Sequence, residues 1–130
     1  FEHVEQVSRA EMIARTLPAI RANLVANPGG PDVYGGAQVF TLLARDLRDH
    51  VSDMSANHLL QFAFPLAARR NLDASAFLRE ADLSEAASCM EQQALLYGKA
   101  QYQGAHHNWS QVADLMEHLA ELEHRLIEVL

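Results

Sequence analysis

The C-terminal segment, residues 108–130, carries an apolar repeat that suits a helix packed along its whole length. Apolar side chains recur there at alternating steps of three and four residues, which places them on one face of an α-helix. The set comprises Val112, Leu115, Leu119, Leu122, Leu126 and Val129. This pattern is typical of helices in bundles and coiled coils, and it also allows the chain to pair with a second copy as a homodimer.

Helical periodicity marks the other apolar segments as well, and none shows the strict two-residue alternation of a strand. The predicted helices cover residues 2–26, 38–51, 57–70, 73–81, 82–102 and 108–130. The sequence therefore predicts an all-α fold, an antiparallel helical bundle of five to seven helices. We expect a single domain over residues 1–130.

Prolines and capping residues set the expected boundaries of these helices. Pro18 should kink or divide the first helix, and Pro65 should kink or break the third. Side chains that can accept hydrogen bonds from a first helical turn predict N-caps, and these are Asp73, Asp82 with Glu85, and Asn108 with Gln111. The glycine- and proline-rich stretch 27–36 is a loop, which either covers a pocket or acts as a linker.

Charge and composition exclude several classes of function. Seventeen acidic and ten scattered basic residues give a net charge of −7, so we expect no direct nucleic-acid binding by this chain. The single Cys89 excludes an internal disulfide and suggests a buried thiol in a reducing, cytoplasmic setting. No apolar run is long enough for a membrane span. The chain opens at Phe1 directly in helical sequence, which suggests a segment of a longer protein.

Three side chains stand out as candidate metal ligands. Asp46 and His50 are four residues apart in a predicted helix, so a carboxylate and an imidazole would share one helical face. His118 lies in the C-terminal helix, and helical bundles build metal sites from side chains on facing helices. We therefore expect Asp46, His50 and His118 to converge around a divalent metal. The simpler alternative is a surface ion pair between Asp46 and His50.

No pattern in the sequence points to catalysis. A nucleophile elbow, a phosphate-binding glycine loop followed by Lys and Ser or Thr, and paired metal-binding cysteines are all missing from the sequence. Glu121 and His124 form one Glu-x-x-H motif, but di-iron bundles need two copies. We expect no enzymatic activity.

Two stretches of the sequence resemble the FCD ligand-binding domain of FadR-like regulators in the GntR family. The residues that carry the resemblance are Asp46, His50, Ser55, Asn57, Leu59 and Leu60, followed by Met116, His118 and Leu119. The resemblance implies a bundle that binds a metal, such as Zn or Ni, through Asp46, His50 and His118, and a small organic acid effector nearby. It also implies a separate DNA-binding domain, which this chain does not contain.

Two functions remain open from the sequence. The first is an effector-sensing domain of a bacterial transcription regulator, which binds a small organic acid, a divalent metal or both. The alternative is a helical protein-interaction module, such as a chaperone, adaptor or dimerisation domain. A sensor should enclose a cavity among its helices, whereas an interaction module should have a filled core and an exposed apolar groove.

Overall fold

The computed structural model describes residues 7–25 and 36–130 of the chain. Their elements are α1 (Arg9–Val25), α2 (Ala37–Asp49), α3 (Asp53–His58), the π-helix η1 (Leu59–Ala63), α4 (Phe64–Glu80), α5 (Ser84–Ala105) and α6 (Trp109–Val129). No strand occurs in these two described stretches. The predicted all-α antiparallel bundle is confirmed. The predicted loop 27–36 lies outside the described residues except for Gly36.

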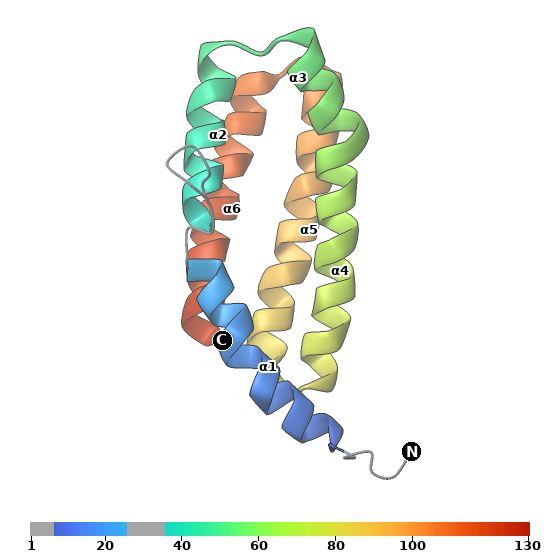
Figure 1. Cartoon of the computed structure of the whole chain (residues 1–130). Coiled ribbons are helices and arrows are strands. Elements are labelled where there is room, and N and C mark those ends of the chain that lie inside the picture. Colours follow the sequence, from blue (N-terminus) through green and yellow to red (C-terminus); the bar gives the residue numbers. More distant parts are fainter. Residues whose placement is uncertain (1–6, 26–35) are drawn as a thin grey trace, which may run out of the picture.

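Helix α6 occupies the centre of the bundle. It packs against α2 on one side and α5 on the other, and α4 packs against the far side of α5. Figure 1 shows these four helices side by side, with α1 crossing near the C-terminal end of α6. Within the described part of the chain, no helix combines the length and apolar character needed to cross a bilayer.

The buried face of α6 forms much of the core. Val112, Met116, Leu119 and Leu126 are all 0% exposed, and burial of each such side chain contributes roughly 1.5–3 kcal/mol to folding. They match the C-terminal apolar repeat, with Met116 in addition. The predicted stripe therefore faces the core, although Leu115 and Val129 are only partly buried.

Aromatic side chains link α2 and α4 to α5. The ring of Tyr97 on α5 lies 6.3 Å from the ring of Phe40 on α2 and 6.3 Å from that of Phe64 on α4. These separations are in the range of favourable aromatic pairs. Burial, with a smaller effect of the Glu123 charge, raises the pKa of Tyr97, so the phenol stays protonated at neutral pH.

A chain of polar side chains runs through the interior from α4 to α6. Asn71 donates to the side-chain oxygen of Gln93 at 2.9 Å, and Gln93 donates to the Glu123 carboxylate at 2.8 Å. Gln93 is 2% exposed and Glu123 is 8% exposed. Burying polar groups costs free energy unless they are hydrogen-bonded. These hydrogen bonds therefore favour the alignment of α4, α5 and α6 in which Asn71, Gln93 and Glu123 all meet.

The two prolines affect their helices less than expected. Pro18 lies inside α1, which continues unbroken from Arg9 to Val25, so the predicted division is wrong. Pro65 lies in the first turn of α4, directly after η1. There the Phe64 amide donates a hydrogen bond to the Leu59 carbonyl, which is the spacing of a π-helix. This wider turn comes just before Pro65, which has no backbone N–H to donate. The predicted break is thus a change of helix type.

Two tight turns of the same kind connect α4 to α5 and α5 to α6. Asp82 and His107 both have φ of 60°, and each turn carries the paired hydrogen bonds of a Schellman motif, Asp82 to Arg79 with Leu83 to Leu78, and His107 to Gly104 with Asn108 to Gln103. The predicted capping box at Asp82 is wrong because that residue lies in the turn after α4, and Leu83 is the residue that precedes α5. Asp73 is interior to α4, and Asn108 precedes α6 without a side-chain cap.

Glycine should stabilise both turns. An L-residue with φ near 60° costs roughly 1–2 kcal/mol relative to the right-handed region, and glycine avoids that cost. Asp82→Gly and His107→Gly should each raise the free energy of unfolding by about 1 kcal/mol. Urea denaturation followed by circular dichroism measures this. A loss of stability in both variants would contradict the assignment of left-handed backbone.

Two glycines in α5 should respond oppositely to a methyl group. A Cβ on Gly98 would meet nothing within 4 Å, whereas a Cβ on Gly104 would lie 2.7 Å from Leu60 Cδ2 and 3.1 Å from the Trp109 ring. Gly98→Ala should therefore stabilise the fold by about 1 kcal/mol through helix propensity. Gly104→Ala should destabilise it by about 1 kcal/mol or more through overpacking. Thermal and urea unfolding of the two variants would compare them directly, and equal effects would refute the packing difference.

Candidate functional site

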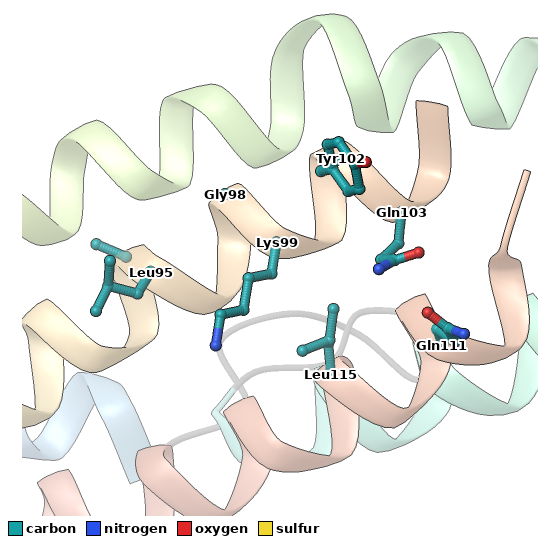
Figure 2. Close-up of a pocket in the computed structure, with 8 residues that line it drawn as sticks. Leu95, Gly98, Lys99, Tyr102, Gln103, Gln111 and Leu115 are labelled. Carbon is teal, nitrogen blue, oxygen red and sulfur yellow. The ribbon is translucent and has the colours of Figure 1, made fainter. Parts of the chain in front are cut away.

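The outer surface of α5 and α6 carries an apolar hollow with a volume of about 650 Å³. Its lining residues are Ala94, Leu95, Gly98, Lys99, Tyr102, Gln103, Gln111 and Leu115. Figure 2 shows Lys99 and Gln103 extending from α5 toward α6, where Gln111 and Leu115 lie. The hollow is open to solvent and is not enclosed by the bundle.

A second, smaller hollow continues the first along the same two helices. It shares Leu95 and Lys99 with the first and adds Gln92, Leu96, His118 and Leu122, with a volume of about 190 Å³. We call the two together the α5/α6 groove. It follows α5 from residue 92 to residue 103, which is roughly 17 Å at 1.5 Å per residue.

Two large apolar side chains stand in solvent along this groove. Leu95 is 68% exposed and Tyr102 is 63% exposed, whereas the adjacent Leu96 is 7% exposed. Gly98 lies between them in sequence, three residues after Leu95 and four before Tyr102, so the three share one face of α5. The face therefore has a bare backbone patch with an apolar side chain at each end.

The polar groups of the groove are mostly neutral. Gln92, Gln103 and Gln111 contribute amides, and Lys99 contributes a cation that pairs with no carboxylate in the described part of the chain. At one end, the His106 ring packs against the Tyr102 ring with their centroids 4.5 Å apart and their planes tilted by 39°, and His106 Nδ1 lies 2.9 Å from the Tyr102 carbonyl oxygen. An apolar strip with amides and one positive charge suits recognition of an amphipathic ligand.

The three predicted metal ligands do not form a common site. Within residues 7–25 and 36–130, no three His, Cys, Asp or Glu side chains are grouped to hold a metal ion. Asp46 is exposed on α2 and lies 3.6 Å from Arg45. His118 lines the α5/α6 groove, and α6 separates that groove from α2.

The backbone at His50 explains why the expected spacing fails. Helix α2 ends at Asp49, and His50 has φ −160° and ψ 136°, so it is extended. Its side chain therefore leaves the helical face that it was expected to share with Asp46. Only the backbones are joined, by the His50 amide to the Asp46 carbonyl at 3.1 Å. The alternative ion pair between these two side chains is not formed either in the described structure.

Helices α2 and α6 are instead joined by an arginine. Arg48 donates to Asp114 at 2.6 Å and to Glu117 at 2.8 Å. These hydrogen bonds raise the pKa of Arg48 above its usual value, Glu117 contributing more than Asp114. All three side chains are well exposed to solvent, so the cluster joins the two helices at the surface, where ion pairs contribute little to stability.

Apart from His118, the groove residues were not identified from the sequence. Residues 94–97 are Ala-Leu-Leu-Tyr, which is apolar on every side of a helix. Periodicity cannot choose a face in such a run. Two signals were available, the seven-residue spacing of Leu95 and Tyr102 and the position between them of Lys99, the one lysine in the sequence.

Comparison with known families corrects the earlier resemblance. The family model described as the YobF C-terminal domain matches residues 29–130, more than three quarters of the chain. Comparison with curated proteins and with solved structures found no match. The FCD assignment is therefore wrong, and the residues on which it was based, Asp46, His50 and His118, do not form its metal centre.

Adjacent leucines on α5 should differ sharply in their contribution to folding. Leu95→Ala should change the free energy of unfolding by less than about 0.5 kcal/mol, because that side chain is mostly in solvent. Leu96→Ala should lower it by about 2–4 kcal/mol by leaving a cavity in the core. Chemical denaturation of the two variants provides the measurement. A comparable loss of unfolding free energy in both variants would mean that the Leu95 side chain is needed for folding and is not available for binding.

Proposed function

We propose that this chain, which belongs to the YobF C-terminal domain family, is a helical protein-interaction module. Its α5/α6 groove would receive the apolar face of an amphipathic helix from another protein. The observation that carries the proposal is the exposure of Leu95 and Tyr102 around the bare backbone of Gly98. Exposed apolar surface of this kind is typical of interaction sites.

The shape of the groove favours a helix as the bound element. The groove lies between two packed helices and extends for roughly 17 Å along α5. A bound helix that presents apolar anchors at i, i+3 or i+4, and i+7 covers about 10.5 Å. Three such anchors therefore fit within the groove.

Gly98 supports a close approach of the partner to α5. Glycine inside a helix destabilises it by about 1 kcal/mol relative to alanine, and no neighbouring atom in the described structure needs the space that a Cβ would fill. Glycine is suited to positions where a ligand approaches the backbone closely. A partner helix crossing α5 at Gly98 would use this space.

The interior supports an interaction module better than a sensor of small molecules. The side chains of Val112, Met116 and Leu119 are fully buried and belong to one hydrophobic cluster at the centre of the bundle. The apolar hollow between α5 and α6, in contrast, opens to solvent. The residues expected to hold an organic acid or a metal, Asp46, His50 and His118, lie apart. We therefore favour the alternative function over effector sensing.

A synthetic helix should test the groove directly. The probe is a fluorescent peptide of about 20 residues, long enough to be helical, with one leucine stripe and only glutamine beside it. Fluorescence anisotropy should show saturable binding to the wild-type protein. Gly98→Trp should weaken binding by about tenfold or more, since a tenfold change corresponds to only about 1.4 kcal/mol and the indole would fill the groove.

A matched control separates the groove from general surface hydrophobicity. Leu95→Ser should weaken peptide binding, whereas Leu72→Ser, at a position on α4 that is 50% exposed, should leave it unchanged. Circular dichroism of each variant reports whether it is folded. Binding that is equal in wild type and Gly98→Trp, or no saturation at about 1 mM protein, would reject the proposal.

A further inference from the structure

We infer that Lys99 selects a partner helix that carries an acidic residue beside its apolar stripe. The inference rests on the proposed function and specifies the chemistry of the partner. Lys99 is the one lysine in the sequence, and it lines both parts of the groove. It therefore lies where any helix in the groove must pass.

Lys99 differs from most other cations of the chain in having no ion-pair partner among residues 7–25 and 36–130. Seven arginines in the described part form ion pairs with a carboxylate. No described carboxylate pairs with Lys99, although the whole chain has a net charge of −7. As far as the described residues go, its ammonium group remains available to a carboxylate from another protein.

The groove contains no negative charge that would oppose an incoming carboxylate. Its lining side chains are apolar, amide or imidazole apart from Lys99 itself. Leu95, Leu115 and Tyr102 would exclude water from a contact at Lys99 once a helix is bound, and partial removal of water strengthens an ion pair. Charge complementarity of this kind gives specificity more than affinity.

The same charges disfavour a second copy of the chain as the occupant. Two copies related by a two-fold axis would present the same face to each other. Each face carries Lys99 and no groove carboxylate, so the facing grooves would supply no counter-ion for either lysine. A different chain that supplies a carboxylate satisfies the site.

A charge-reversal experiment tests the inference. The first probe is the leucine-stripe peptide with glutamine beside the stripe. In a second series of peptides each of these glutamines is replaced in turn by glutamate, and in a third series each is replaced in turn by lysine. Wild-type protein should bind the best glutamate peptide about two- to fivefold more tightly than the glutamine peptide, which lies within the range expected for an exposed ion pair. Lys99→Met should bind the glutamate and glutamine peptides with equal affinity while still binding the glutamine peptide. Lys99→Glu should instead bind the best lysine peptide more tightly than the glutamine peptide.

The outcomes separate this inference from the proposed function. If all three proteins rank the peptides alike while Gly98→Trp still blocks binding, the acidic selection is wrong and the interaction module stands. If no peptide binds but decanoate binds in a Lys99-dependent manner, the occupant is a small amphipathic acid and both proposals fail. A wild-type dimer at micromolar concentration that Gly98→Trp disrupts, seen by analytical ultracentrifugation, would likewise overturn the inference in favour of self-association.

Discussion

Burial of one face of α6 is the interaction on which the rest of the structure depends. Helices α2 and α5 both pack against α6, and α4 reaches the bundle through α5. The buried residues of α6 lie at helical spacing over its full length. They therefore form one face of α6 against which the neighbouring helices pack, and the opposite face of α6 remains in solvent. The α5/α6 groove exists because the two helices meet along their buried faces and diverge toward the surface.

Much of the fold was predictable from local patterns. The apolar repeat of α6 was predicted because the residues that form it lie close together in the sequence. The cap at the start of α3, where Ser52 accepts from the Ser55 amide, is equally local but was not predicted. The π-helix before Pro65 was not predictable from local residue patterns. Its hydrogen bonds depend on how the backbone of the preceding helix adjusts to a proline in the next turn. Asp82 was misassigned because an acidic residue ahead of a helix resembles an N-cap, whereas packing of Leu83 near Leu78 makes it the end of the previous helix.

The candidate site was harder to predict for a different physical reason. Asp46 and His50 had the spacing of a helical pair, but that spacing has meaning only while the helix continues, and α2 stops one residue before His50. The groove gave a weak local signal because α5 is apolar on several faces, so buried and exposed leucines look alike in sequence. Only the position of α6 distinguishes Leu95 from Leu96. Of the three predicted ligands, His118 alone lies in the groove.

The two Schellman turns also bear on the order in which the chain assembles. They join α4, α5 and α6 through connections of three residues, so these helices can pack after closing only short loops. Helix α2 meets α6 across a separation of 66 residues between Arg48 and Asp114, and its docking carries a larger loss of chain entropy. We therefore expect α2 to dock on α6 only after α4, α5 and α6 have packed together. The α5/α6 groove lies wholly within the early-forming part, so a transient opening of α2 would leave its two walls in place.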